Sequence, residues 1–121
     1  MRHRRAHRQL GRAGDQRDAI LRSIVTGVIT HGRIETTATR AKEAKPVLEK
    51  LITSARGGDI AAMRLARRAL GNQPAVIKRL FEVVAPQYKE RPGGYARIIR
   101  SGVRRGDSAP VALLELVDFS K

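Results

Sequence analysis

Apolar residues recur at three- and four-residue spacing in the first third of the chain, which is the pattern of an amphipathic helix. The stripe consists of Ile20, Leu21, Ile24, Val25, Val28 and Ile29. It predicts a helix over residues 16–30, with Asp15 as its N-cap and Gly32 as the residue that follows its end.

Two further helices are predicted from the same kind of spacing. The second begins with Thr39 as its cap and ends at Gly57-Gly58. Pro46 lies inside this pattern and lacks a backbone donor, so it should kink the helix or make it start late. The third helix runs from its cap Asp59 to Leu70.

The pattern changes from helix to strand in the last third of the chain. Apolar positions over 76–84 predict a fourth helix that stops at Pro86, whereas 95–103 and 110–117 are strand-like. A short β-branched stretch at 34–37 should join them, because two strands alone are marginally stable, and the very apolar 110–117 should be the central strand. The predicted fold is α+β in the order α-β-α-α-α-β-β, with helices on one face of a small three-stranded sheet.

Residues 1–14 differ from the rest of the chain. They carry five arginines and no acid, and Leu10 is the only sizeable apolar side chain after Met1. Such a segment cannot anchor a core, so we expect a basic, extended N-terminal arm followed by a single globular domain over 15–121. Basic arms of this kind usually bind nucleic acid, and a solubilising tail is the alternative.

The charge balance narrows the choice of partner. The 121 residues include 25 Lys and Arg against 11 Asp and Glu, a formal net charge of +14. A small domain needs a net charge of only about 2–8 for solubility, so the excess indicates a polyanionic partner. Only four residues are aromatic, which argues against a surface that stacks single-stranded bases.

Several other classes of protein are disfavoured. The chain has no cysteine, which excludes disulfides, thiol catalysis and cysteine zinc sites. Its apolar runs are far shorter than the roughly 20 residues that cross a bilayer, so no membrane partner is expected. No apolar segment follows the charged N-terminus before Asp15, so it does not resemble a secretory signal. We expect a cytoplasmic protein, and the inside of an organelle after processing is the alternative.

The sequence offers no site for catalysis, a metal or a cofactor. His3 and His7 lie in the arm, and His31 follows a helix, where histidine commonly complements the last carbonyl groups. No motif presents several carboxylates to Mg²⁺, and no glycine-rich phosphate loop or small-molecule site is present. Arg105-Gly106-Asp107 spells a cell-adhesion tripeptide but is expected to form a hairpin turn.

Arginine is the positive signal. It supplies 19 of the 25 basic residues, and its planar guanidinium suits phosphate oxygens. Besides the arm there is a group at Arg64, Arg67 and Arg68, and another around the loop 92–95, where two glycines would let the backbone approach a phosphate. Tyr95 could stack on a base or cover the core. The residues predicted to bind RNA are Arg2, His3, Arg4, Arg5, His7, Arg8, Arg12, Arg17, Arg91, Gly93, Gly94, Tyr95, Arg97, Arg100, Arg104 and Arg105.

RNA is favoured over DNA as the polyanion. Segments 59–70 and 74–85 resemble a helix-turn-helix, but the second is mostly apolar, with Lys78 and Arg79 as its only basic residues. A basic arm and separate arginine groups suit an RNA recognised by its shape and backbone. A DNA-compacting or regulatory protein and an RNA-processing enzyme are the alternatives.

Three segments carry a likeness to a known family. They are the arm from Met1-Arg2-His3-Arg4-Arg5 to Arg17, the stretch from Gly32-Arg33-Ile34-Glu35-Thr36-Thr37 to Gly57-Gly58-Asp59, and the stretch from Leu80-Phe81 through Arg91-Pro92-Gly93-Gly94-Tyr95 to Glu115-Leu116-Val117. These segments resemble the bacterial large-subunit ribosomal protein numbered seventeen. The resemblance implies an α+β fold and a structural, non-enzymatic role. It also implies binding to large-subunit ribosomal RNA near the mouth of the peptide exit tunnel, beside neighbouring ribosomal proteins, with the arm drawn into RNA crevices. A homo-oligomer is not expected.

Overall fold

A computed structural model describes residue 10 and residues 13–119. Its elements are α1 (Gly14–His31), β1 (Arg33–Thr37), α2 (Ala38–Gly57), α3 (Ile60–Leu70), α4 (Pro74–Arg79), the π-helical turn η1 (Leu80–Val84), α5 (Ala85–Gln87), β2 (Ala96–Val103) and β3 (Pro110–Leu116). The order matches the predicted α+β arrangement. Within the described residues, no helix is long and apolar enough to cross a membrane.

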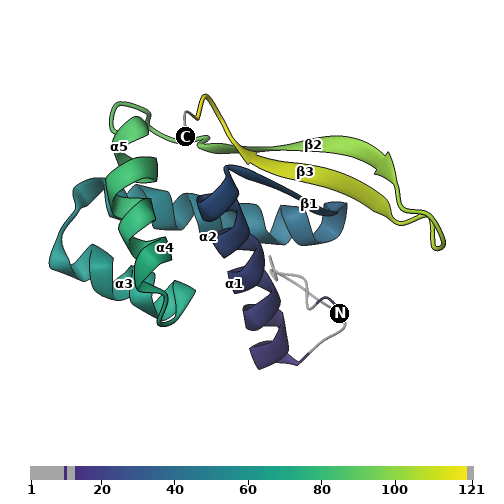
Figure 1. Cartoon of the computed structure of the whole chain (residues 1–121), viewed down its shortest axis with the longest axis horizontal. Coiled ribbons are helices and arrows are strands. Elements are labelled where there is room, and N and C mark those ends of the chain that lie inside the picture. Colours follow the sequence, from purple (N-terminus) through teal and green to yellow (C-terminus); the bar gives the residue numbers. More distant parts are fainter. Residues whose placement is uncertain (1–9, 11–12, 120–121) are drawn as a thin grey trace, which may run out of the picture.

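The sheet has three antiparallel strands in the order β1-β3-β2, so β3 is central, as its hydrophobicity predicts. Helix α2 lies directly under one face of the sheet (Figure 1). Helices α1 and α3 pack on α2, and α4 packs on α1 and α3. The other face is uncovered. The hairpin of β2 and β3 extends past the helices, which exposes its end (Figure 1).

The core fills the space between the sheet and the helices. Its largest fully buried side chains include Ile29, Leu48, Leu70, Leu80 and Leu114, one from each of five elements. The alternation along β3 buries Ala112, Leu114 and Leu116 against α2 and leaves the residues between them partly exposed.

Two predicted helix caps are wrong. The structure places Ala13 at the N-cap of α1, and Asp15 lies inside the first turn, where its Oδ1 accepts a bond from the Gln16 amide at 2.9 Å. For α2 the cap is Thr37, whose Oγ1 accepts from the Arg40 amide at 3.4 Å, and Thr39 is already helical. The predicted cap of α3 is confirmed, since Asp59 Oδ1 accepts from the Ala62 amide at 2.8 Å.

The structure contradicts the late helix start expected from Pro46 and the helix stop expected at Pro86. Helix α2 begins at Ala38, well before Pro46, so Pro46 does not delay its start. Pro86 does not stop the fourth helical segment, because η1 widens the backbone before it and the Ala85 amide bonds to the Leu80 carbonyl. A wider turn relieves the clash between a proline ring and the carbonyl of the preceding turn.

Candidate nucleic-acid interface

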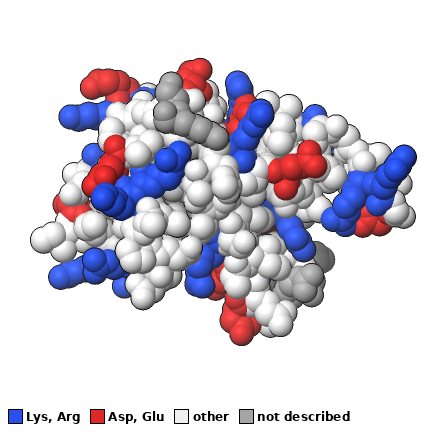
Figure 2. Space-filling view, viewed as in Figure 1, with Lys and Arg blue, Asp and Glu red and all other residues white. Residues whose placement is uncertain are grey.

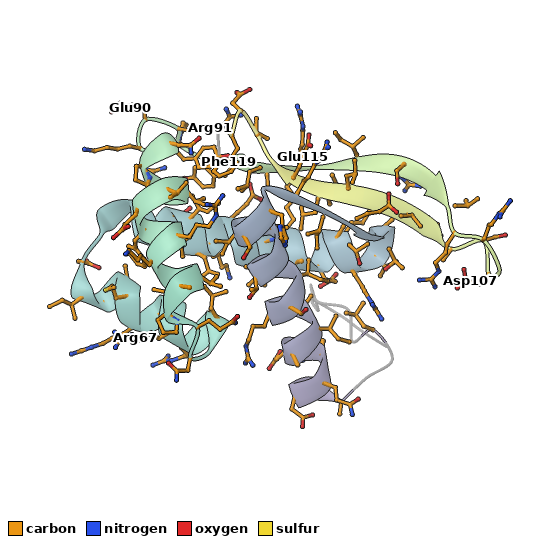
Figure 3. All side chains as sticks on the ribbon, viewed as in Figure 1. Arg67, Glu90, Arg91, Asp107, Glu115 and Phe119 are labelled. Carbon is orange, nitrogen blue, oxygen red and sulfur yellow. The ribbon has the colours of Figure 1, made fainter. Side chains whose placement is uncertain are left out.

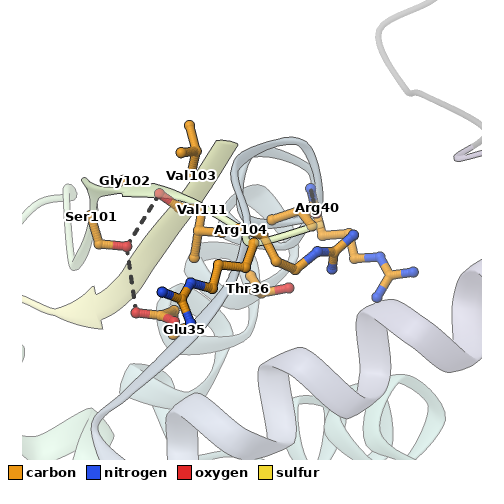
Figure 4. Close-up of a pocket in the computed structure, with 10 residues that line it drawn as sticks. Glu35, Thr36, Arg40, Ser101, Gly102, Val103, Arg104 and Val111 are labelled. Carbon is orange, nitrogen blue, oxygen red and sulfur yellow. Dashed lines mark hydrogen bonds between the residues drawn. The ribbon is translucent and has the colours of Figure 1, made fainter. Parts of the chain in front are cut away.

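A groove of about 490 Å³ lies where the extended hairpin passes the start of α2 (Figure 4). It is lined by Glu35, Thr36, Thr37, Arg40, Ser101, Gly102, Val103, Arg104, Arg105 and Val111. Three arginines therefore share one concave surface with two threonine hydroxyls. We call this surface the hairpin groove.

The start of α2 adds to the positive potential of the hairpin groove. Thr36 and Thr37 end β1 directly where the 20-residue helix begins, so the groove faces the helix N-terminus. The partial positive charge there and the guanidinium of Arg40 both favour an anion. Figure 2 shows Lys and Arg side chains gathered at the free end of the hairpin.

The turn of the hairpin holds Arg104 in place. The Asp107 carboxylate accepts from Arg104 Nη2 at 2.5 Å and from Arg104 Nε at 3.2 Å, and it also accepts from the Ala109 amide at 3.1 Å. Gly106 has a φ of 100°, which favours glycine. The predicted hairpin turn at Arg105-Gly106-Asp107 is confirmed.

The contact between Arg104 and Asp107 shifts the pKa of both side chains. The hydrogen bond from Arg104, then that from the Ala109 amide, lower the pKa of Asp107 to about 2. The same pair raises the pKa of Arg104. Asp107 therefore stays charged at neutral pH and fixes Arg104.

A β-bulge shapes the side of the groove nearest the sheet. The pairing of β2 with β3 shifts between Arg100 and Gly102, which leaves Ser101 as the extra residue. The Ser101 hydroxyl lies 3.4 Å from Glu35 Oε2 and 3.3 Å from the Val111 carbonyl oxygen, and these contacts are dashed in Figure 4. Among the described residues that line the groove, Glu35 is the one acid, against three arginines.

The loop 92–95, which contains two glycines, lies at the opposite end of β2, away from the hairpin groove. Arg91 Nε donates to the Gly93 carbonyl at 3.1 Å, and Arg91 Nη1 lies 3.4 Å from Asp118 Oδ2. Gly94 has a φ of 65°, and a Cβ atom at Gly93 or Gly94 would meet nothing within 4 Å. The loop backbone is therefore open to an approaching group, and Arg91 is held against it (Figure 3).

Tyr95 is a core residue, which decides between the two roles that the sequence left open. Its side chain is 1% exposed, and its ring lies 5.3 Å from that of Tyr88. Arg56 donates to the Tyr95 hydroxyl and lies over its ring at 5.7 Å, while the Tyr95 amide donates to Glu49 Oε2 at 3.1 Å. Of the two alternatives the ring therefore covers the core, and the contact of Tyr95 with RNA through its backbone stays a prediction.

The remaining predicted arginines are spread along the molecule. Arg97 lies opposite Glu115 on the uncovered face of the sheet, and its Nε donates to Glu115 Oε1 at 2.5 Å (Glu115 is labelled in Figure 3). Arg100 is exposed and pairs across the sheet with Ala112, which pairs with Thr36 on its other side. Arg17 is half-buried in the first turn of α1.

The arginines from 91 to 105 therefore do not form one patch. Arg97 and Arg104 are seven positions apart, which corresponds to about 23 Å of extended chain. The fold brings Arg104 and Arg105 together with Arg40 and leaves Arg91 at the far end. The predicted contacts at Arg2, His3, Arg4, Arg5, His7, Arg8 and Arg12 lie outside the described residues.

Arg40 is a groove residue that the sequence interpretation missed. It follows Thr37 by three residues on the first turn of α2, and α2 follows β1 without a loop. Pairing of β1 with β3 then sets this turn beside the hairpin. The Thr36-Thr37 pair between strand and helix is the sequence feature that could have pointed to Arg40. It does so only once the order of the strands in the sheet is known.

The described residues include no group of three or more His, Asp or Glu side chains that could hold a metal ion. The groove chemistry is cationic, with hydroxyl donors, and suits an anion with several oxygens. The part of its lining that the structure describes includes neither a histidine nor a pair of carboxylates for acid–base catalysis.

Comparison with known proteins decides the family. The model of the family described as ribosomal protein L17 matches residues 20–117. The chain belongs to the ribosomal protein L17 family. As a member of that family it is a structural, non-enzymatic ribosomal component, so the RNA-processing alternative is excluded.

Curated relatives agree along nearly the whole L17-family chain. The large ribosomal subunit protein bL17 of Clostridium botulinum strain Loch Maree is 53% identical over 111 residues, covering 92% of this chain and 97% of the relative. The bL17 proteins of Clostridium acetobutylicum and Clostridium beijerinckii are each 51% identical over 111 residues, again 92% of this chain, and cover 96% and 97% of their own lengths.

Proposed function

We propose that the chain binds large-subunit ribosomal RNA through two cationic surfaces, the N-terminal arm and the hairpin groove. It works in the cytoplasm as a constituent of the large ribosomal subunit, near the peptide exit tunnel, beside neighbouring ribosomal proteins. Each surface neutralises phosphates of a different RNA segment. By holding both segments the protein clamps them together.

The observation that carries this proposal is the assembly of Arg40, Arg104 and Arg105 around one groove. These residues come from two elements that are distant in sequence, and a hairpin turn braced by Asp107 fixes one of them. Guanidinium groups held in a concave surface bind phosphate oxygens with little loss of side-chain entropy. The net charge of +14 and the five arginines of the arm support the same partner.

The arm is proposed to act through charge alone. Five arginines without an acid would engage about five phosphates, which corresponds to a log–log salt slope of roughly −3.5 to −4.5 for the arm. Gly93 and Gly94 would add a close backbone approach to the RNA, since no atom of residues 13–119, apart from the adjoining residues, lies within 4 Å of a Cβ built at either position.

The test compares the full chain with a variant that lacks residues 2–12, using large-subunit ribosomal RNA over a range of salt. We expect the deletion to weaken binding strongly and to remove most of that slope, while the thermal melt stays nearly unchanged. A melt that collapses with the deletion would show that arm residues belong to the core. Equal affinity of the full chain for random duplex DNA would favour the DNA-compacting alternative.

A further inference from the structure

Helix α3 turns large apolar side chains outward. Of the five large hydrophobic residues that are well exposed among the described residues, three lie in this 11-residue helix: Ile60 at 71%, Met63 at 37% and Leu65 at 42%. Its buried face consists of Ala62, Ala66 and Leu70, so only one of its large apolar side chains packs fully against the core. Ile60 and Met63 are three residues apart and so lie on one side of the helix, and exposed apolar residues that lie together commonly mark an interaction site.

A second groove, of about 370 Å³, lies between α3 and the α4–η1 segment. Met63, Ile77 and Phe81 give it an apolar floor, and Arg67 and Lys78 line it as cations beside one acid, Glu82. Arg67 is labelled at this end of the molecule in Figure 3, and Figure 2 shows a largely uncharged area over these helices with cations near its margin. We call this surface the α3–α4 groove.

We propose that the α3–α4 groove binds an acidic amphipathic segment of another protein. An apolar side chain of the partner sits on Met63 and Phe81, and its carboxylates pair with Arg67 and Lys78. Ile60, Met63 and Arg67 recur at the three- and four-residue spacing of one helix stripe, which extends for about 10 Å. That length fits about two turns of a partner helix laid into a groove.

The chemistry of the α3–α4 groove favours a protein over RNA. The hairpin groove has three arginines, two threonines and a helix N-terminus, all of which suit phosphate oxygens. The α3–α4 groove has an apolar floor, which contributes nothing to a phosphate, and two cations that complement carboxylates. The two surfaces therefore serve different partners, and this inference does not depend on which RNA the hairpin groove binds.

Methionine is a direct reporter for the test, because the chain contains only Met1 and Met63. The full chain, labelled with ¹³C at the methionine methyl groups, is titrated with an acidic helical peptide whose leucines are spaced at i, i+3 and i+7 between glutamates. The same peptide with lysine in place of each glutamate, and a single-stranded RNA oligonucleotide, are titrated in parallel. We expect a saturable shift of the Met63 methyl signal with the acidic peptide only, whereas binding to the arm would move Met1.

Two variants on one helix distinguish the effect of a charge inside the α3–α4 groove from the effect of the net charge of the protein. Arg67→Glu reverses a charge that lines this groove, and Arg68→Glu makes the same change at the next residue, which borders a different hollow with Asp18 and Leu21. Both side chains are exposed, so both variants should keep the wild-type melt. We expect Arg67→Glu to weaken the peptide about fivefold or more and Arg68→Glu to leave its affinity unchanged.

Three results would overturn the proposal: no shift of Met63 with the acidic peptide, a shift of Met63 by RNA at lower concentration than by peptide, or equal weakening by the two variants. A fourth test uses assembled large subunits that carry Met63→Cys, the only cysteine in the chain. We expect this thiol to react with a maleimide reagent. Protection that ribonuclease treatment removes would show that RNA covers the groove, and would contradict the proposal.

Discussion

Neutralising two arginines of the hairpin groove should weaken RNA binding in a way that salt reveals. Arg40→Gln and Arg105→Gln remove one cation from α2 and one from the hairpin tip, and neither arginine is braced by a carboxylate as Arg104 is by Asp107. If each arginine holds one phosphate, the double variant loses two counterion-releasing contacts. The slope of log K against log salt then becomes shallower by about 1.4–1.8.

The matched control changes the net charge equally at sites outside the groove. Lys42 is exposed two residues after Arg40 on the same helix, and Lys89 is exposed in the turn after α5. The assay is filter binding of a large-subunit ribosomal RNA fragment across a range of potassium chloride. Equal loss of slope in Lys42→Gln/Lys89→Gln and in Arg40→Gln/Arg105→Gln would mean that only overall charge matters, and would refute the groove as a site.

Three further predictions concern the fold that presents the groove. Leu114→Ala empties a fully buried position of the central strand and should lower the free energy of unfolding by about 2–5 kcal/mol in urea titrations. Leu113→Ala, on the uncovered face of the sheet, should lower it by less than half of that amount. Equal losses would contradict the assignment of the two residues to opposite faces. Burial raises the pKa of Tyr88 to about 12, so the folded state keeps a proton that the unfolded state loses near pH 10. The free energy of unfolding should therefore be constant below pH 10 and fall between pH 10 and about pH 12. Tyr88→Phe should abolish that fall in denaturation curves. The pKa of Asp107 is lowered to about 2, so its carboxylate should stabilise the hairpin turn above about pH 4 and lose that effect as the pH falls through 2. An NMR titration of its carboxyl carbon with a midpoint near 4 would argue against the contact with Arg104.

The order of elements could be predicted from the sequence because its signals are local. The stripe from Ile20 to Ile29 marks α1 whatever surrounds it, and Asp59 caps α3 through its own helix. The central place of β3 followed from its hydrophobicity, since a strand paired on both sides and covered by a helix must be apolar. The helix caps were harder, because Thr37 and Thr39 are chemically alike and only the end of β1 distinguishes them.

The site depended on contacts that are distant in sequence. Arg40 became a groove residue only because β1 pairs with β3 and carries the start of α2 to the hairpin. Tyr95 became a core residue because Arg56 and Glu49, both on α2, bond to its hydroxyl and its amide. Spacing along the chain predicts neither contact, so the sequence interpretation grouped Arg91 with Arg105 although they lie at opposite ends of β2.

A structure of the large ribosomal subunit that contains this chain would test the central claim most directly. The measurement is the distance from the guanidinium nitrogens of Arg40 and Arg105 to the nearest phosphate oxygen. We predict charge-assisted hydrogen bonds of about 2.7–2.9 Å to the ribosomal RNA backbone at the hairpin groove, with the arm also lying along RNA. A hairpin groove that faces open solvent or a protein, with no phosphate in contact, would contradict the claim.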